Sequence, residues 1–477
     1  MSISSEKKVL NFTEWFDKIL EEAKIVDNRY PVKGFLVYRE YGYKIIENIR
    51  LLLERKLEET NHKAMLFPIV ISEDSFSKEA EHIAHFKEEV FWIEKAGNKK
   101  LDRMLILRPT SETAIYPMLQ LWIRSHVDLP FKMHQSVTVY RYETKATRSL
   151  FRVREILWNE AHTAHATPED AEKQVEEAIK IYSEVFNELG IAYLLLKRPE
   201  FDKFAGAVYS IAFDAWNPDG KVNQVGTVHN LGTNFSKVFD VKYEKKDGTW
   251  DYVYTTCYGF GFSRTLAAVI AQHGDDHGCV FPSKIAPIQL VIIPIPYKGF
   301  ENDIENYCIE IFNKLKDDYR VTIDNRKDVR PGEKFYYWEL LGVPIRIEIG
   351  PSEVKEKTVT LVRRDNLNRK NVSIENLQYE INSLLNDLDN NLRSKSKKIL
   401  ENLIENCFNV KDVKKALSQK KIARVEWCGS GKCAEILKNE AGGEIRGTRV
   451  DIIEKANGKC LVCGKESKEI VYVARAY

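Results

Sequence analysis

The chain has 477 residues, of which 44% are hydrophobic and 30% are charged, and its formal net charge is +2. This length exceeds what one hydrophobic core usually supports, so about two to four domains are expected. The small net charge excludes a strongly basic or acidic protein. Residues 1–20 lack the apolar core of a secretory signal, and the proline-broken apolar run at 285–297 is too short to span a bilayer. We therefore expect a cytoplasmic multidomain protein with no membrane partner.

The first elements alternate helical and strand-like patterns. Residues 36–60 carry apolar side chains at helical spacing and predict an amphipathic helix. A strand-like run follows at 65–71, and Pro68 inside it favours an edge, bulge or interface strand. Residues 101–107 predict a strand that leads through a turn at 108–112 into another helix.

The segment 137–158 predicts a strand, a loop and a second strand. Because strand side chains alternate between two faces, Arg141 and Glu143 would share one face. Thr167 before Pro168 is typical of a helix start, and that helix is expected to end near Leu189.

Gly190 would be the residue just beyond this helix. Residues 191–258 mix short strands with turn signals at 217–220 and 246–248. Two glycines, Gly259 and Gly261, then open an apolar helix at 265–272.

The pattern changes near residue 285 to strands that alternate with helices. Such alternation favours a small, separate α/β domain. The expected elements are strands at 289–293, 321–324, 343–349 and 358–363, a helix at 302–318, and a highly charged helical segment at 372–406. We place domain boundaries near 283 and 400, which gives domains at 1–283, 284–400 and 401–477.

Four of the eight cysteines form two closely spaced pairs near the end of the chain. The pairs are Cys428 with Cys433 and Cys460 with Cys463, and glycines flank the first pair. Four thiolates at such spacing suit a tetrahedral zinc ion in a reducing compartment. The alternative is four free thiols. We predict a closed, structural zinc site that holds a small domain together.

Two histidine-containing segments are weaker metal candidates. His162 and His165 are three residues apart, and the segment 273–277 contains a glycine that indicates a loop. We interpret both segments as solvated loops, because isolated histidines are seldom ligands.

Three arginines stand where a nucleotide phosphate would need them, at Arg141, Arg152 and Arg264. Arginine presents a planar, permanently charged fork that matches phosphate oxygens. Glu143 adds an acceptor for an amine such as that of adenine, and a Walker loop is absent from the sequence. The glycines before Arg264 are a weak signal alone. Together these residues predict ATP bound without a Walker loop.

These segments, taken in order, resemble the three signature motifs of class II aminoacyl-tRNA synthetases. The matching segments are 36–71, 137–160 and 256–270. Further segments are similar to prolyl-tRNA synthetases, namely 108–112, 203–207, 224–229, 329–335 and 341–351. The cysteine-bearing tail and Tyr477 are similar to the archaeal/eukaryotic type, and 161–258 leaves no room for a large editing insertion.

The resemblance implies an α+β multidomain fold. Its parts would be an antiparallel class II sheet flanked by helices, an α/β anticodon-binding domain and a small zinc-containing α/β domain. It implies ATP-dependent activation of L-proline to prolyl-adenylate and transfer to tRNA(Pro), with Mg²⁺ as a cofactor and a homodimer as the assembly. No protein general base is needed, because the substrate carboxylate is already a nucleophile.

The same resemblance assigns roles to individual residues. Arg141 would contact the α-phosphate, Glu143 the adenine amine and Arg152 the γ-phosphate. The implied catalytic residues are Arg141 and Arg264; ATP would contact Arg141, Glu143, Arg152, Gln224, Thr227 and Arg264. Proline would contact Thr110, Glu112, Arg141, Trp158, Phe204 and His229, and the anticodon Arg330, Glu333, Lys334 and Arg346.

Three alternatives stay open on the sequence alone. One is another class II synthetase, such as a threonyl, glycyl or histidyl enzyme. A second is a non-catalytic tRNA-binding relative, and a third is a zinc-stabilised scaffold protein without ATP dependence. For the anticodon candidates, the alternative is a solvated charged loop.

Overall fold

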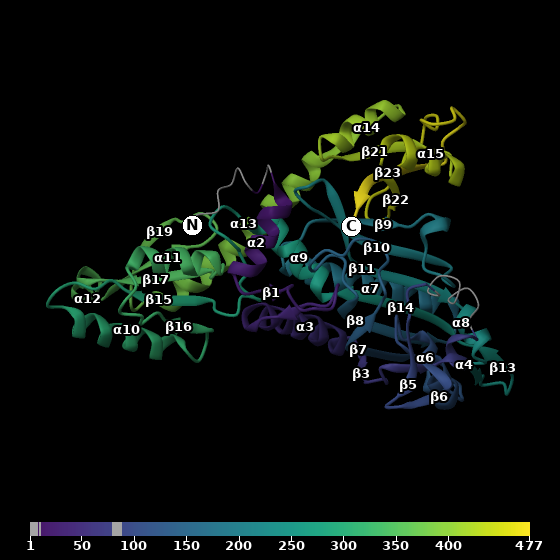
Figure 1. Cartoon of the computed structure of the whole chain (residues 1–477), viewed down its shortest axis with the longest axis horizontal. Helices are drawn as coiled ribbons and strands as arrows, with labels where there is room; N and C mark the ends of the chain where they lie inside the picture. The colour runs from purple at the N-terminus through teal and green to yellow at the C-terminus, as the bar shows by residue number, and fades with distance from the viewer. Residues whose placement is uncertain (1–7, 9–10, 79–87) are drawn as a thin grey trace.

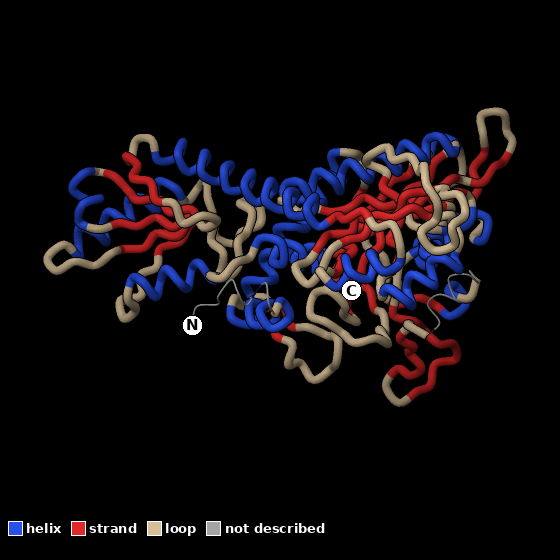
Figure 2. Tube along the Cα trace, turned by 90° about the horizontal axis from the view of Figure 1, so that it is seen from above, coloured by secondary structure: helices blue, strands red, loops and turns tan. Residues whose placement is uncertain are grey.

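The computed structural model describes residue 8 and residues 11–78 and 88–477. The molecule is elongated, with a large sheet-based body joined to a smaller α/β unit (Figures 1 and 2). Within the described residues, no helix combines the length and apolar composition that a membrane span requires.

The large body is built around a mixed, mainly antiparallel sheet of 11 strands in the order β20-β21-β23-β22-β9-β10-β11-β14-β8-β7-β3. The strands before residue 285 in this sheet are β3 (Lys63–Ala64), β7 (Phe131–Tyr140), β8 (Glu155–His165), β9 (Tyr193–Lys197), β10 (Tyr209–Trp216), β11 (Lys221–Gly232) and β14 (Tyr254–Gly261). Smaller sheets pair β1 (Val26–Asp27) with β2 (Val37–Tyr38), β12 (Lys242–Glu244) with β13 (Trp250–Tyr252), and β6 (Lys99–Leu107) with both β4 (Val70–Ser72) and β5 (Phe91–Ala96).

Helices cover this sheet: α3 packs against both α7 and α9, and α7 and α9 pack against the central strands β11 and β14 (Figure 1). The helices of the body are α2 (Phe12–Glu22), α3 (Glu40–Glu59), α4 (Glu73–Phe76), α6 (Glu112–Trp122), α7 (Pro168–Glu188), α8 (Asn234–Val238) and α9 (Phe262–His273), with short 3-10 turns η1 (His126–Asp128) and η2 (Glu200–Asp202). The apolar faces of α2, α3, α7 and α9 meet the sheet in one core cluster, and those of α6 and α8 meet it in a second cluster.

Helix α7 shows how local sequence sets an element. The Thr167 hydroxyl accepts the Asp170 N–H at 3.1 Å, and Pro168 occupies the first turn. Such an N-cap stabilises a helix by about 1 kcal/mol. Gly190 follows the helix with φ of +65°, the left-handed conformation that glycine adopts without strain. Both predicted ends of this helix are confirmed.

The predicted strand at 65–71 is wrong. The chain forms only β3 before it and β4 at its end, and the residues between them take no strand conformation. Side chains from elsewhere satisfy this backbone instead, since Arg108 donates to the carbonyl oxygen of Phe67 at 2.8 Å and Gln135 accepts from the Phe67 N–H at 2.9 Å. Pro68 contributes no N–H to a ladder.

The smaller unit is a five-stranded sheet in the order β16-β15-β17-β18-β19, packed with helices. Its elements are β15 (Leu290–Pro294), α10 (Glu301–Leu315), β16 (Val321–Ile323), α11 (Pro331–Leu340), β17 (Ile345–Ile349), α12 (Pro351–Glu356), β18 (Thr358–Arg363), β19 (Arg369–Ser373) and α13 (Leu377–Leu403). The predicted α/β unit is confirmed. Strand β19 was missed, because its first three residues are exposed and polar, and the charged helix begins only at Leu377.

Helix α13 leads back to the large body, where strands of the last segment complete the 11-stranded sheet (Figures 1 and 2). Its elements are β20 (Ile404–Asn406), α14 (Val410–Ser418), β21 (Ile422–Trp427), α15 (Gly431–Ala441), β22 (Glu444–Arg449) and β23 (Glu469–Ala476). Strand β22 pairs with β9. At Gly447, φ is +132° and a Cβ would lie 2.1 Å from the Lys197 oxygen, so this junction requires glycine.

Candidate active site

A cavity of about 260 Å³ lies over strands β8, β10, β11 and β14. It brings together residues from segments far apart in the sequence. Nine of the predicted site residues line it, namely Thr110, Glu112, Arg141, Trp158, Phe204, Gln224, Thr227, His229 and Arg264. The cavity therefore contains most of the residues that the sequence assigned to ATP and proline, but other residues make up more than half of its lining.

Arg141 lies one residue beyond the end of β7. Its Nε donates to the Pro109 oxygen at 3.0 Å, and its guanidinium carbon lies 5.4 Å from the centre of the Trp158 ring. Burial lowers its pKa, although nearby carboxylates such as Glu89 and Glu112 oppose that effect. Main-chain and aromatic contacts therefore hold this side chain in the cavity.

The argument that strand alternation puts Arg141 and Glu143 on one face is wrong. The ladder between β7 and β8 ends before both residues, and the Glu143 N–H bonds to the Arg141 oxygen at 2.7 Å within the connecting loop. The predicted strand–loop–strand order is confirmed. The two side chains are related by loop geometry, since a loop residue does not follow the two-residue period.

Arg264 lies in the first turn of α9, which begins three residues earlier than predicted, at Phe262. Its Nε donates to the Phe151 oxygen at 3.0 Å and its Nη1 to the Gln224 oxygen at 3.3 Å. Burial, followed by the positive charges of Arg141 and Arg152, lowers the pKa of Arg264 to about 10. The guanidinium groups thus converge closely enough to repel one another, which suits a polyanionic ligand.

Glu143 and Arg152 lie outside this main cavity. Their side chains form an ion pair at 3.6 Å, and Arg152 lines a neighbouring polar cavity of about 240 Å³. The two cavities share Asp202, Gln224 and Arg264. A ligand with a long phosphate tail could therefore extend from one cavity into the next.

At the other end of the cavity, aromatic and buried polar side chains lie close together. The rings of Phe204 and His229 lie 4.7 Å apart, and His229 Nδ1 lies 2.7 Å from the Ser210 hydroxyl. Burial lowers the pKa of His229 to about 4, so this imidazole is neutral near pH 7. Thr110 donates a hydrogen bond to Glu112, which lies among these groups. This end offers a carboxylate within walls of aromatic and neutral side chains.

The interpretation of His162 and His165 as solvated loop residues is wrong, because both are buried in β8. His162 Nε2 lies 3.2 Å from the Glu160 carboxylate. Burial alone would lower the pKa of His162, but this contact and the charge of Glu112 raise it. His273 is also buried, inside α9. In the ladder with β14, His162 is paired with Cys257 and His165 with Tyr254, so both histidines belong to the central sheet.

Several lining residues were missed by sequence reasoning, namely Glu160, His162, Arg198, Ser210 and Cys257. Donor atoms of Glu112, His162 and Cys257 lie within 4.8 Å of one another. The His162–Glu160 contact and a hydrogen bond between Cys257 and Glu112 account for this group without a cation. The polar residues that recur along β8 were the sequence signal for a lined pocket.

The four predicted zinc ligands come together, and their sulfur atoms all lie within 4.8 Å of one another. Cys428 Sγ lies 3.7 Å from both Cys433 Sγ and Cys463 Sγ. Zinc–sulfur bonds of about 2.3 Å in a tetrahedron put sulfur atoms about 3.8 Å apart. Gly429 has φ of +81° and turns the chain between the first two ligands. The geometry and the all-thiolate donor set fit a structural zinc ion.

Family models match this chain over most of its length. The tRNA synthetase class II core domain (G, H, P, S and T) matches residues 91–273, an anticodon binding domain matches 289–384, and the C-terminal domain of prolyl-tRNA synthetase matches 410–477. Proline--tRNA ligase from Pyrococcus horikoshii is 48% identical over 98% of both chains, and that from Sulfurisphaera tokodaii is 47% identical over 100% of both.

The chain belongs to the proline--tRNA ligase family. It is also similar to a solved prolyl-tRNA synthetase of Giardia lamblia in complex with prolyl-adenylate, with 35% identity and a TM-score of 0.95 over 100% of this chain and 99% of that one. The corresponding Cryptosporidium parvum enzyme, complexed with halofuginone and AMPPNP, gives 31% identity and a TM-score of 0.94 over 100% and 97%. Family membership excludes the threonyl, glycyl, histidyl and scaffold alternatives.

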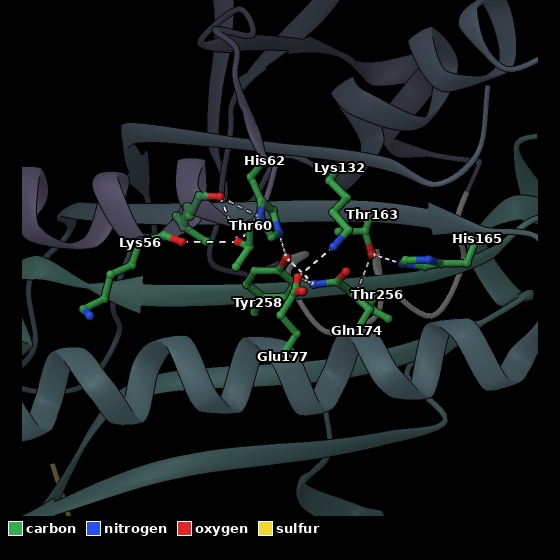
Figure 3. A network of polar contacts seen from close by, with 11 residues as sticks. Lys56, Thr60, His62, Lys132, Thr163, His165, Gln174, Glu177, Thr256 and Tyr258 are labelled. Carbon is green, nitrogen blue, oxygen red and sulfur yellow. Dashed lines mark hydrogen bonds and ion pairs between the residues drawn. The ribbon is translucent and has the colours of Figure 1, made fainter. Parts of the chain in front are cut away.

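A buried polar network surrounds Tyr258 on the side of the sheet that carries α7 (Figure 3). The hydroxyl of Tyr258, a lining residue, bonds to His62 and accepts from Gln174 at 3.3 Å. Gln174 in turn donates to Glu177 at 2.9 Å, and Lys132 donates to the same carboxylate oxygen at 2.7 Å. The network ties the end of α3 to β14 and α7, and it holds the strand that carries the glycines of the third motif.

The predicted anticodon residues of this family member divide into two kinds. Arg330 and Glu333 are exposed at the start of α11. Lys334 is buried and donates to the Asp324 oxygen at 2.9 Å, while Arg346 is buried between Glu339 at 2.7 Å and Glu348 at 2.9 Å. The expectation that all four side chains meet RNA directly conflicts with this burial, because the last two are committed to ion pairs inside the unit.

Proposed function

We propose that this chain charges tRNA(Pro) with L-proline in two steps, through prolyl-adenylate. The observation that carries the proposal is the convergence of Arg141 and Arg264 on one cavity that also holds Glu112 and an aromatic enclosure. This arrangement puts phosphate-binding groups beside a pocket for a small cationic ligand. The membership of this chain in the proline--tRNA ligase family supports the same reaction.

In the first step, a carboxylate oxygen of proline attacks the α-phosphorus of ATP and diphosphate leaves. The substrate is already a nucleophile at neutral pH, so the protein's task is to align the reactants and stabilise developing charge. Arg141 would bind the α-phosphate, and Arg264 would lie against adenine and reach the phosphate tail. Their fixed main-chain contacts mean that little reorganisation is needed. In the second step, a hydroxyl at the 3′ end of the tRNA takes the prolyl group and AMP leaves.

The remaining nucleotide contacts are proposed as follows. Glu143 would accept from the adenine amine, and Arg152 would bind the γ-phosphate from the neighbouring cavity. Gln224 and Thr227 line the main cavity and would hold the nucleotide between these ends. The ion pair between Glu143 and Arg152 supports a common position for these two side chains at one edge of the ligand.

The end of the cavity that is lined by Glu112, Phe204 and His229 would bind proline. Glu112 and Thr110 would receive the imino group, which carries a positive charge, while Trp158 and Phe204 would pack against the ring. His229 is neutral there, so it would not repel that charge. Small apolar pockets distinguish similar ligands by only about 1–3 kcal/mol. At least one of alanine and cysteine is therefore expected to be activated to a measurable extent.

Two metal ions belong to the proposal. Zinc would be held by Cys428, Cys433, Cys460 and Cys463 and would stabilise the C-terminal fold. Mg²⁺ would bind mainly through the ATP phosphates, as it usually does, with one or two protein carboxylates. Asp202 is the candidate carboxylate, since it lines both cavities. When bound, Mg²⁺ would neutralise phosphate charge.

The tRNA would lie along both units of the molecule. Single-stranded anticodon bases are read by stacking and by contacts to base edges. Arg330 and Glu333 are exposed and would make such contacts, and Tyr336 beside them is 60% exposed. Lys334 and Arg346 would act from within, by fixing the shape of this surface through their ion pairs.

The proposed domains are 1–283 for catalysis, 284–400 for anticodon binding and 401–477 for the zinc-binding part. The proposed location is the cytoplasm and the proposed assembly is a homodimer.

Exposed apolar side chains near the first motif support the dimer, with Leu66 81%, Trp122 42% and Val127 76% exposed. Light scattering on the purified chain measures its mass in solution. A monomer at micromolar concentration would contradict the proposed homodimer.

Pyrophosphate exchange with proline, cysteine and alanine in parallel tests the proposed function. We expect exchange with proline and weaker exchange with at least one of the other two. Exchange with none of them would contradict the function, and undetectable activity with both cysteine and alanine would contradict the selectivity argument alone.

A further inference from the structure

A buried ion cluster joins the C-terminal segment to the catalytic sheet beside the nucleotide cavity. Asp214 on β10 accepts two hydrogen bonds from Arg198, at 2.6 and 3.0 Å, and one from Arg446 of β22, at 2.8 Å. The side chains of Asp214, Arg198 and Arg446 are only 0%, 3% and 10% exposed. Arg446 thus reaches this cluster from a strand that lies 232 residues beyond Asp214 in the sequence.

The cluster ends on a residue of the nucleotide cavity. Arg198 Nη2 donates to the carboxamide oxygen of Gln224 at 2.7 Å, and Arg198 Nη1 donates to the Arg446 main-chain oxygen at 2.6 Å. Asp214 and Gln224 are direct partners in the β10–β11 ladder, where the register shifts. With its oxygen engaged by Arg198, the carboxamide of Gln224 has a defined orientation and leaves its NH₂ group as the donor for a ligand.

The orientation of Gln224 depends on both Arg198 and Arg446, because both neutralise the buried charge of Asp214. Burial alone would raise the pKa of Asp214, but Arg198 and then Arg446 lower it well below its usual range, so the group stays a carboxylate. Without Arg446, Arg198 would be the main cation facing that carboxylate and could move towards it. Such a shift would change the contact between Arg198 and Gln224. A buried network with one member missing rarely keeps its geometry.

The backbone around Arg446 holds it in place. Its neighbour Gly447 has φ of +132° and packs against the Lys197 oxygen, and β22 pairs with β9 just beyond this point. Arg446 also lines the second cavity, together with Gln224 and Arg264. The C-terminal segment therefore contributes a rigidly mounted cation directly behind the nucleotide cavity.

We propose that Arg446 is a positioning residue for ATP: through Asp214 and Arg198 it orients the Gln224 carboxamide, so that the C-terminal segment completes the nucleotide site. This inference rests on the proposed role of Gln224 in holding ATP. It differs from a purely structural role, in which the cluster would join two parts of the fold without affecting one substrate more than another.

The test compares Arg446→Met with Arg449→Met, which removes another arginine from the same strand. Arg449 pairs with Asp451 outside the cluster and serves as the matched control. Pyrophosphate exchange gives KM for ATP and for proline, each at saturating co-substrate. For Arg446→Met we expect KM for ATP to rise about tenfold, as for loss of a hydrogen bond to a charged group, with KM for proline within twofold. The control keeps both values. An unchanged KM for ATP, or an equal rise in both KM values, would overturn the inference.

A second set of variants separates this inference from the proposed function. Gln224→Ala should raise KM for ATP, and adding Arg446→Met should raise it little further, since both act on one contact. A rise with Gln224→Ala and independent, multiplicative effects in the double variant would overturn the positioning role only. No rise with Gln224→Ala would overturn the role of Gln224 and the inference with it. If the Arg446→Met variant does not fold, Arg446→Lys tests the inference instead. Lysine keeps the positive charge but lacks the planar guanidinium group that contacts Asp214. We then expect about a threefold rise in KM for ATP, and a wild-type value would overturn the inference.

Discussion

The main-chain oxygen of Phe151 accepts a hydrogen bond from Arg264 Nε at 3.0 Å, which ties the loop after β7 to the start of α9. The same Phe151 ring stacks on Tyr477 with centroids 4.1 Å apart. The Tyr477 hydroxyl bonds to Asp219 at 2.5 Å. Tyr477, which directly follows β23, therefore supports the loop that contacts Arg264, one of the two central arginines.

Replacing Tyr477 tests this support. Tyr477→Ala removes the stack, and aromatic pairs contribute about 0.5–1.5 kcal/mol beyond burial. We expect KM for ATP to rise about 2- to 10-fold in pyrophosphate exchange. Tyr477→Phe keeps the stack and loses only the hydroxyl contact, so it should stay near the wild type. Equal effects of the two variants would show that the ring does not matter.

Removal of one thiol tests the zinc site. Cys433→Ser is expected to lower the bound zinc from about one per chain to near zero and to lower Tm, because structural zinc sites contribute directly to folding. Metal content by atomic emission and Tm by calorimetry measure both effects. Cys407→Ala is the control, since Cys407 is buried outside the four-cysteine group. Full zinc content in Cys433→Ser would contradict the assignment.

The buried histidine of the network around Tyr258 predicts a pH dependence of stability. Burial, with a smaller effect of Lys132, lowers the pKa of His62 to about 4, so the folded protein resists a proton that the unfolded chain binds near pH 6.5. The free energy of unfolding should therefore fall as pH drops from about 6.5 to 4, by up to about 1.4 kcal/mol per pH unit for this one group. Above about pH 6.5 this contribution is fully present.

Urea unfolding at several pH values measures that slope. His62→Gln should remove about one of the protons that bind on unfolding between pH 4 and 6.5. The free energy of unfolding should then change less steeply with pH. His126→Gln, a change at a half-buried position outside the network, should keep the wild-type slope. An unchanged slope in His62→Gln would contradict the neutral, buried state of this histidine.

Some of this structure could be predicted from the sequence because its causes are local. Thr167, Pro168 and Gly190 define both ends of α7 through capping and backbone conformation, and the cysteine spacing brings the four thiols together. The prediction of a strand at 65–71 failed because side chains distant in sequence, those of Arg108 and Gln135, form the hydrogen bonds of the Phe67 main chain. Such long-range contacts leave no local pattern.

The candidate site shows the same division. Residues inside recognisable motifs, such as Arg141 and Arg264, could be assigned to one cavity before its geometry was known. Arg446 could not, because its partner Asp214 is far away in sequence and neither stands in a distinctive motif. Lys334 and Arg346 stood in a motif, yet their burial depends on Asp324, Glu339 and Glu348, which only the folded sheet brings near.

Proline-dependent pyrophosphate exchange by Arg141→Ala tests the central claim most directly. The account predicts a loss of about 10²-fold or more in the rate of prolyl-adenylate formation, the scale of removing one donor that stabilises a transition state. Arg103→Ala, at an exposed arginine on β6 that does not line the cavity, should keep the wild-type rate. A rate for Arg141→Ala within about threefold of the wild type would contradict the claim that this guanidinium stabilises the reacting phosphate.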